Sequence, residues 1–502
     1  MGDRRACTPV FVLPQGLTVT GVNTWALSLV ERGDARAIVH GAHPSHSAFD
    51  TTAPGLVHLD AHAADPESLS NEYRAVFERI ARESGVPVAP IPTRHDGCFA
   101  AIAAIVRDTP DLVRPILWQQ NDSRYEDVLI EHFEPMASAL VGASEHLGRS
   151  ITYRVPHRAG DTLVIYNAVR VPARAPSREP TTGRPLRLVY AGRVEHEQKR
   201  AGALVPMSEE LARRGIAHHL RIIGDGPAIN DVHAQAERHV HVELVGPVAS
   251  QDVEAHLCWA DIFVLCSRHE GLSFALLEAM AAGCVPVMTR TRSGADEAVV
   301  DNVSGVLIDA PDDDAGTALA MAGGVQRAQR LGLGKLSNEA HGRMRERFDL
   351  ETHARALGSL CEHLAQTPAR AWPSERPLSA RDPGVIRRRA EALIERAFGS
   401  QPRGRFVVHG VGAHTRALEP LLRAHAASIV AFTDDDPGSW GRTLLGKPIV
   451  QPSEAHACRA TDVLISSDLH EESIWHRREA YELQGLRVHR LYDAQMPLRA
   501  AH

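Results

Sequence analysis

Several features that mark particular protein classes are scarce in this 502-residue sequence. Its seven cysteines are scattered, with no CxxC pair and no Cys/His cluster, so neither a disulfide framework nor a zinc site is predicted. No apolar run approaches the roughly 20 residues of a membrane-spanning helix. The net charge of −7 argues against a nucleic-acid partner and leaves room for peripheral membrane contact at most. These absences favour a cytoplasmic protein with reduced thiols.

Lysine is nearly missing. Only Lys199, Lys335 and Lys447 occur, and almost every other cation is arginine. Such a bias is typical of a GC-rich coding background. A lysine that survives it is therefore a candidate for a chemical role.

What the sequence does contain is a repeated alternation of short apolar runs with amphipathic segments, which predicts an α/β protein with mostly parallel sheets. The alternation starts three times, near residues 9, 186 and 405. Stretches rich in proline, 171–185 and 368–383, predict linkers between the three parts. Strands are predicted at 9–14, 35–42, 56–61, 114–120, 139–144, 162–169, 186–192, 219–224, 242–246, 261–267, 285–289, 305–309 and from 405, and helices at 67–84, 95–108 and 384–398.

The stretch Asp261 to Val287 has the pattern of a strand, a tight loop, a helix and a second strand. Glycine in the loop lets the backbone turn so that free amides at the helix start face one point, which suits a phosphate. Glu270 and Glu278 flank this point and are better suited to accept hydrogen bonds from hydroxyls. The alternative is a pair of solvated acids, but Glu278 lies in an apolar helix, where an unpartnered carboxylate is costly. A phosphate between two polyols describes a nucleotide sugar.

Two cations follow the predicted strand at 186–192. Arg193 and Lys199 would emerge at its carboxyl end, where ligands bind in such sheets, and could hold a diphosphate as it departs. The alternative is two ordinary surface cations. The glycines of GDGP (224–227) predict a structural turn, and GPV (246–248) a strand end that could meet a flat base.

Taken together, these motifs resemble the donor-binding domain of the glycosyltransferase group 1, or family 4, enzymes. The matching segments read YAGR…K, GDGP, VELVGPV, ADIFVLCSRHEGLSFALLEAMAAGCVPV and EAVVDNVSGVLID. The resemblance implies a GT-B fold, in which two doubly wound Rossmann-like domains face a cleft. It also implies a retaining transfer of a hexosyl group from a UDP- or GDP-linked sugar, with no required cofactor or metal. The acceptor, whether a glycan, a lipid-linked or a small molecule, is left open.

Roles carry over residue by residue from this resemblance. Arg193 and Lys199 would bind the donor diphosphate, and Glu270 would hold sugar hydroxyls. Glu278 would take the ribose hydroxyls, and Val248 would touch the base. Backbone close to sugar and phosphate is implied at Gly21, Gly271, Leu272, Ser273 and Phe274.

The first domain matches the family less well. Members often carry a histidine after the strand equivalent to 114–120, whereas here Gln119 or Gln120 occupies that place. Glutamine can hydrogen-bond a sugar but cannot take a proton. A catalytically degenerate module that only binds or senses nucleotide sugars is therefore the alternative function. The predicted organisation is 1–180 and 186–345 for the two GT-B domains, 346–370 for a tail crossing back, 371–399 for a linker and helix, and 400–502 for a third domain.

The third domain contains most of a dinucleotide-binding pattern. Gly410 and Gly412 follow a strand, Thr415 opens a helix, and a second strand ends in Asp434, but the third glycine is missing. The region resembles a small Rossmann-like domain attached to some sugar-modifying enzymes, which implies a second nucleotide site. The alternative is a docking or oligomerisation domain. The acidic triplets 312–314 and 434–436 contain carboxylates, which hard metal ions prefer as ligands. The first triplet follows a predicted strand in a turn-like segment, which favours a solvated loop. No metal site is predicted.

Overall fold

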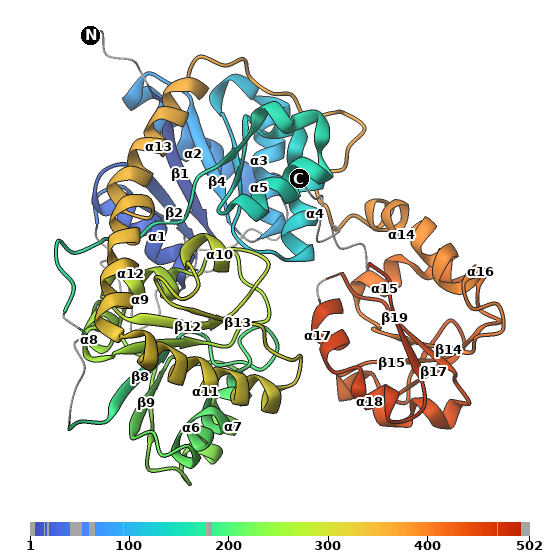
Figure 1. The fold of residues 1–502 in the computed structure, drawn as a ribbon. Helices are drawn as coiled ribbons and strands as arrows, with labels where there is room; N and C mark the ends of the chain where they lie inside the picture. Colours follow the sequence, from blue (N-terminus) through green and yellow to red (C-terminus); the bar gives the residue numbers. More distant parts are fainter. Residues whose placement is uncertain are drawn as a thin grey trace. The chain divides into compact units, whose positions relative to one another are not determined.

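The computed structural model describes residues 6–14, 16–17, 20–40, 53–59, 66–93, 95–176, 178, 183–468 and 470–492. The chain forms two compact units, Met1–Pro373 and Ser374–His502. In Figure 1 the first unit runs from blue to orange and the second from orange to red. Each unit is described by itself.

The N-terminal part of the first unit is built on two parallel sheets. The first sheet has the order β3-β2-β1-β4 and the second the order β5-β6-β7. Its strands are β1 (Thr8–Leu13), β2 (Arg36–His40), β3 (Leu56–Leu59), β4 (Val88–Pro92), β5 (Ile116–Gln119), β6 (Ala139–Gly142) and β7 (Thr162–Val164). The helices are α1 (Gly21–Glu31), α2 (Pro66–Ser84), α3 (Asp96–Asp108), α4 (Arg124–Phe133) and α5 (Glu145–Arg154).

Strand β4 was not predicted from the sequence. Its prolines explain why it was missed and why the strands of the N-terminal part form two sheets instead of one. The carbonyl of Val88 accepts a hydrogen bond from the amide of Arg114, so this residue faces β5. Pro90 and Pro92 face the same way because a strand alternates with a period of two. Neither has an N–H to donate, so the ladder to β5 stops after one bridge.

The middle part of the first unit is a six-stranded parallel sheet of order β10-β9-β8-β11-β12-β13, and every one of its strands lies in a region predicted from the sequence. Large apolar side chains from both faces of the sheet form its core, and helices cover them. The strands are β8 (Leu186–Ala191), β9 (His218–Ile223), β10 (Val242–Gly246), β11 (Ile262–Leu265), β12 (Val285–Thr289) and β13 (Val306–Ile308). The helices are α6 (Leu204–Arg213), α7 (Ile229–Ala236), α8 (Ser250–Trp259), α9 (Phe274–Ala281), α10 (Ala295–Ala298), α11 (Asp314–Leu331) and α12 (Leu333–Arg347).

Helix α13 (Leu350–Leu364) returns from the middle part to the N-terminal part and joins its apolar core. His353 on this helix is buried; its Nε2 accepts a hydrogen bond from Trp25 Nε1 at 2.9 Å, and its Nδ1 lies 2.7 Å from the Tyr166 carbonyl. Burial lowers the pKa of His353 to about 4. A neutral imidazole therefore connects the helix to the N-terminal part.

The second unit contains a six-stranded sheet of order β16-β17-β15-β14-β18-β19, parallel except for β16. Helix α14 (Pro383–Gly399) packs its apolar face into the core of this unit. The strands are β14 (Phe406–His409), β15 (Ile429–Thr433), β16 (Thr443–Leu444), β17 (Lys447–Val450), β18 (Asp462–Ile465) and β19 (Arg487–Arg490). The remaining helices are α15 (Ala413–Ala417), α16 (Glu419–Ala424), α17 (Glu471–His476) and α18 (Glu479–Glu482).

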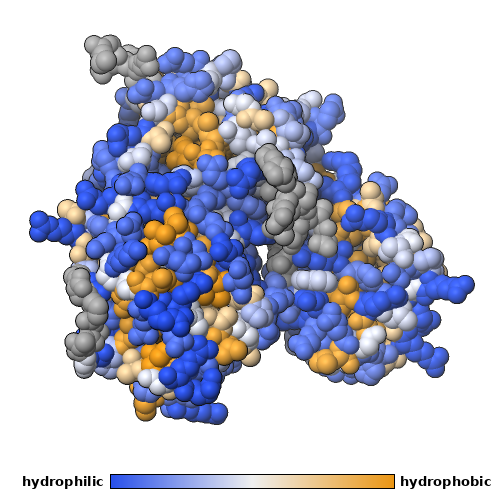
Figure 2. All heavy atoms as spheres, viewed as in Figure 1, coloured by the Kyte–Doolittle hydropathy of each residue, from blue (hydrophilic) through white to orange (hydrophobic). Residues whose placement is uncertain are grey.

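The surface drawn in Figure 2 is mostly hydrophilic, with apolar residues gathered in smaller patches. Among the described residues, no helix combines the length and the apolar character that a membrane crossing requires.

Candidate functional site

A crevice forms where the strand order of the middle sheet reverses. Strands β8 and β11 lie next to each other at its centre, and the loops that follow them, 192–200 and 266–273, meet at their carboxyl ends. Hydrogen bonds join these loops, among them Arg268 N to Gln198 O (2.8 Å), Gln198 Nε2 to His269 O (3.0 Å) and Arg268 Nη1 to His196 O (2.8 Å). This is the position at which open α/β sheets bind their ligands.

A buried pair of opposite charges lies in this crevice. Lys199 Nζ donates to Glu270 Oε1 at 2.5 Å, and the side chains are 16% and 6% exposed. The same carboxylate oxygen accepts from Ser267 Oγ at 2.5 Å. Burying two charges costs free energy unless they are paired and hydrogen-bonded, as they are here. The sequence assigned these two residues to diphosphate and sugar, and the structure brings them into direct contact.

Beside this pair, the start of α9 presents unpartnered backbone amides. Within the described residues, the amides of Gly271, Leu272, Ser273 and Phe274 donate no hydrogen bond. The Ser273 hydroxyl caps the helix by accepting from the amide of Leu276 at 3.4 Å. Free amides at a helix start attract an anion. The local geometry therefore supports the predicted phosphate position.

Glu278 lies one turn into α9 and is half-buried. Its carboxyl forms no hydrogen bond or ion pair with any described residue. Burial raises its pKa from 4.5 to about 7. A hydroxyl that hydrogen-bonds to this carboxyl would stabilise it, because leaving a buried acceptor unpaired costs free energy. This is compatible with the ribose role implied by the family resemblance.

Two other residues expected to contact the donor follow strands of the same sheet. Arg193 is exposed directly after β8, and within the described part of the chain its guanidinium makes no hydrogen bond or ion pair. Val248 follows β10 and packs partly against the core. Gly224 has a φ of +128°, and a Cβ there would lie 1.9 Å from the Gly192 carbonyl oxygen. The GDGP turn thus serves the packing of the loop after β8.

The N-terminal part closes directly over the start of α9. A Cβ on Gly271 would lie 1.7 Å from the carbonyl oxygen of Gln120, so only glycine fits there. A Cβ on Gly21 would lie 2.6 Å from Cδ2 of Phe274, whose ring stacks on Trp25 at 6.3 Å between centroids. Gly21 opens α1 after the capping residue Thr20. The backbone of Gly21 thus packs against the Phe274 ring, and its predicted approach to a donor phosphate stays a prediction.

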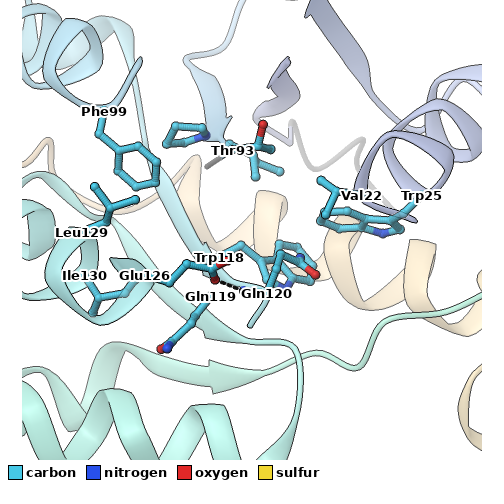
Figure 3. Close-up of a pocket in the computed structure, with 12 residues that line it drawn as sticks. Val22, Trp25, Thr93, Phe99, Trp118, Gln119, Gln120, Glu126, Leu129 and Ile130 are labelled. Atoms are coloured by element: carbon cyan, nitrogen blue, oxygen red, sulfur yellow. Dashed lines mark hydrogen bonds between the residues drawn. The ribbon is translucent and has the colours of Figure 1, made fainter. Parts of the chain in front are cut away.

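The two glutamines that replace the expected histidine have different surroundings. Gln119 is buried and donates from Nε2 to Asp127 Oδ1 at 3.0 Å. Gln120 is 7% exposed, and neither atom of its side-chain amide has a partner among the described residues. Both glutamines line a small cavity of about 20 Å³, which side chains of α1, α3 and α4 surround (Figure 3). Gln120 is therefore the glutamine whose whole side-chain amide is unpaired within the described residues, whereas in Gln119 only Oε1 is unpaired.

Glu126 shapes the loop that carries Gln120. Its Oε2 accepts from the amides of Gln120 (2.6 Å) and Asn121 (2.9 Å), and its Oε1 accepts from Asn121 Nδ2 (3.0 Å). Figure 3 shows its side chain reaching the loop from α4. The acids after the WQQN segment were not singled out in the sequence, although an acid in the first turn of the helix that follows a strand can take this role.

A second set of residues that the sequence did not reveal joins the two halves of the first unit. Arg292 Nη2 lies 3.0 Å from Asp122 Oδ2, and Glu297 Oε2 accepts from the amide of Glu145 at 2.7 Å. Burial alone would raise the pKa of Asp122, but a hydrogen bond from His146 and the charge of Arg292 outweigh it and hold the pKa below its usual value. These contacts join segments far apart in sequence, so no local pattern signals them.

The residues predicted for a second nucleotide site come together in the other unit. Gly410, Gly412, Thr415 and Asp434 all line one cavity at the carboxyl ends of β14 and β15. Of the acidic triplets, Asp313 caps α11, and no metal-binding group of three or more His, Cys, Asp or Glu side chains is found in the described ranges.

Comparison with known proteins agrees with this geometry. Residues 185–324 match the family described as Glycosyl transferases group 1. The chain is 30% identical over 251 residues to the glycogen synthase of Mycobacterium tuberculosis. The aligned residues cover 48% of this chain and 57% of that protein. It is 29% identical over 191 residues to a putative colanic acid biosynthesis glycosyltransferase of Salmonella typhimurium. This alignment covers 36% of this chain and 46% of that protein. The chain thus spans about half the length of these curated relatives.

Solved structures share the fold of much of the chain. HepE of Anabaena, in complex with UDP and glucose, gives a TM-score of 0.56 at 15% identity and covers 70% of this chain and 99% of its own. Sucrose-phosphate synthase of Thermosynechococcus elongatus gives a TM-score of 0.56 at 14% identity. It covers 71% of this chain and 99% of its own. These likenesses define an α/β protein with GT-B-like parallel sheets. We refer to the segment that matches the family, residues 185–324, as the group 1 domain.

Proposed function

We propose that this chain is a nucleotide-sugar-dependent glycosyltransferase that moves a hexosyl group to an acceptor hydroxyl with retention of configuration. The observation that carries the proposal is the buried Lys199–Glu270 pair beside four unpartnered amides of 271–274. This arrangement offers cations and N–H donors to a diphosphate and a carboxylate to the hydroxyls next to it. The group 1 match of the same segment supports it.

In the proposed reaction, the bond between the anomeric carbon and the diphosphate oxygen breaks, and its electron pair leaves on the phosphate. Lys199, Arg193 and the amides at the start of α9 stabilise that charge. The acceptor oxygen bonds to the same carbon, and its proton passes to the leaving phosphate, because Gln120 cannot take a proton. Attack from the phosphate side retains the configuration. The chain's own groups therefore supply orientation and charge stabilisation.

The remaining donor contacts are those that the family resemblance implies. Glu278 would accept hydrogen bonds from the ribose hydroxyls, and Val248 would touch the base. The buried side-chain amide of Gln120 has no partner among the described residues and would hydrogen-bond a sugar hydroxyl, as both donor and acceptor. A UDP- or GDP-linked donor is proposed because HepE, which shares the fold, was solved with UDP and glucose, and mannosyltransferases with partial similarity are named as GDP-mannose-dependent.

The test is a screen of UDP- and GDP-sugars for binding by calorimetry and, in parallel, for release of the nucleoside diphosphate. We expect one donor to bind and to release its diphosphate, and Glu270→Gln to abolish most of that release. Glu254→Gln, the same change on an exposed residue of α8, should leave release unchanged. Binding without any release from the unaltered chain would favour a nucleotide-sugar sensor and contradict the transferase.

A further inference from the structure

The second unit contains its own crevice at a strand-order reversal. Strand β14 has β15 on one side and β18 on the other, and the cavity lies at the carboxyl ends of all three. Its cavity volume is about 450 Å³. Small-molecule sites occupy roughly 300–1,000 Å³ and favour such reversal points. Position and size therefore make this a candidate ligand site.

The glycines after β14 leave the cavity wall as bare backbone. Gly410 has a φ of +109°, and a Cβ there would lie 2.7 Å from the Ser466 carbonyl oxygen. Gly412 has an ordinary φ of −72°, and a Cβ there would meet nothing within 4 Å. Thr415 stands where a third glycine is usual and donates from Oγ1 to the Ser466 carbonyl at 2.9 Å. The loop is thus anchored to β18 and open toward the cavity, as a phosphate requires.

Two carboxylates follow β15 at the opposite wall. Asp434 Oδ2 accepts from the amide of Val411 at 2.8 Å, which fixes it against the glycine loop. Asp435 accepts from Arg477 Nη2 at 2.8 Å. A hydrogen bond with His409, and then Arg477, holds the pKa of Asp435 below its usual value. Ionised acceptors at the end of the second strand are where ribose hydroxyls bind in nucleotide crevices.

A buried ring and a free cation complete the lining. His414 is 7% exposed; its Nε2 lies 2.7 Å from the Tyr492 hydroxyl, and its Nδ1 has no partner among the described residues. Arg381 is exposed at the cavity, and its guanidinium makes no hydrogen bond or ion pair in the part of the unit that is described. An unpaired buried nitrogen costs free energy that a polar ligand can offset.

We propose that this crevice binds a nucleoside diphosphate, with its ribose hydroxyls on Asp434 and Asp435 and its diphosphate over the 410–412 loop toward Arg381. This second site goes beyond the proposed transferase function and does not depend on it. Binding there involves no bond breaking.

Hydrogen–deuterium exchange of the full chain tests the proposal, because its peptides report the two crevices separately. The probes are UDP, GDP and ADP at millimolar concentration, with inorganic phosphate and NAD⁺ as comparators. Gly412→Leu places a side chain in the open space of the cavity without a strained φ. Gly399→Leu, at the exposed end of α14, where a Cβ also meets nothing within 4 Å, is the matched control.

We expect at least one nucleoside diphosphate to slow exchange in 408–416, 432–440 and 464–474. Gly412→Leu should raise the dissociation constant for that protection at least about ten-fold. Gly399→Leu should leave it unchanged, and both variants should keep any protection of 266–280. The proposal would be overturned if no nucleoside diphosphate protected these segments, if inorganic phosphate protected them equally, if only NAD⁺ did so, or if Gly412→Leu kept full protection.

Discussion

The two crevices of this protein occupy the same topological position but differ in their polar groups. In the group 1 domain, a cation and a carboxylate are buried together, with side chains 16% and 6% exposed. In the second unit, the comparable pair Arg477–Asp435 is 50% and 43% exposed, and the buried groups that line the crevice include the rings of His409 and His414. Topology thus fixes where a ligand lies. A buried cation next to the ligand additionally allows charge to be stabilised as a bond breaks.

The largest effect is expected from removing the buried cation. Lys199→Met should lower the rate of nucleoside diphosphate release by about 10²–10³-fold, because preorganised donors to a developing charge contribute on this scale. Binding of the free nucleoside diphosphate should weaken much less. Steady-state kinetics with calorimetry on the same preparation would separate the two quantities.

Lys335→Met is the matched control, since Lys335 is exposed on α12. It should leave both the rate and the affinity unchanged. A loss below ten-fold for Lys199→Met would remove the proposed difference between the two crevices.

Next in size are substitutions at the glycines that shape each crevice. Gly224→Ala and Gly410→Ala combine a positive φ with Cβ positions 1.9 Å and 2.7 Å from carbonyl oxygens. We expect each to lower the free energy of unfolding of its own unit by about 3 kcal/mol. Gly412→Ala should be nearly neutral. Urea unfolding followed by exchange would assign each loss to a unit, and a large loss for Gly412→Ala would show that its surroundings are not open.

Glu278 makes stability depend on pH in the group 1 domain. Its pKa of about 7 in the fold exceeds the ordinary 4.5, so between these values the folded chain holds more protons than the unfolded chain. Its stabilising contribution is complete below the ordinary value and is lost as the pH rises through the folded value. The free energy of unfolding should fall over this window by roughly 3 kcal/mol at most. Glu278→Gln should remove that slope, and an identical slope in the variant would contradict the assignment.

The smallest effect is expected at the contact between the two halves of the first unit. Arg292 is 33% exposed where it pairs with Asp122, and such pairs contribute about 0–1 kcal/mol. Arg292→Ala should raise the KM for the donor a few-fold and leave kcat nearly unchanged. Arg330→Ala on the exposed face of α11 should change neither. A loss confined to kcat would point to a role in the reaction itself.

Much of the fold could be predicted from the sequence because periodicity and glycine act locally. All six strands of the middle sheet were predicted, since their apolar runs are bounded by turn residues. Strand β4 was missed because its prolines argue against a strand. In the structure, Pro90 and Pro92 face β5 rather than β1, and on that side the hydrogen-bond ladder stops, so their missing N–H groups are tolerated.

The candidate site divides in the same way. Glu270, Lys199 and Gly271 could be singled out because their residue types and spacing carry a chemical requirement. The direct Lys199–Glu270 contact, the Asp122–Arg292 pair and the approach of Gln120 to Gly271 could not, because each joins segments separated by 71 to 170 positions. Such contacts depend on how loops meet after the sheets form.

The most direct test of the central claim is a double-variant cycle on the buried pair. The rate of nucleoside diphosphate release would be measured for the unaltered chain, Lys199→Met, Glu270→Gln and the two changes combined. Because Lys199 Nζ and Glu270 Oε1 form one hydrogen-bonded unit, we predict a large loss for each single change and a combined loss within about ten-fold of the larger one. Losses that multiply, or single variants that retain normal turnover, would contradict the assignment of this crevice as the transfer site.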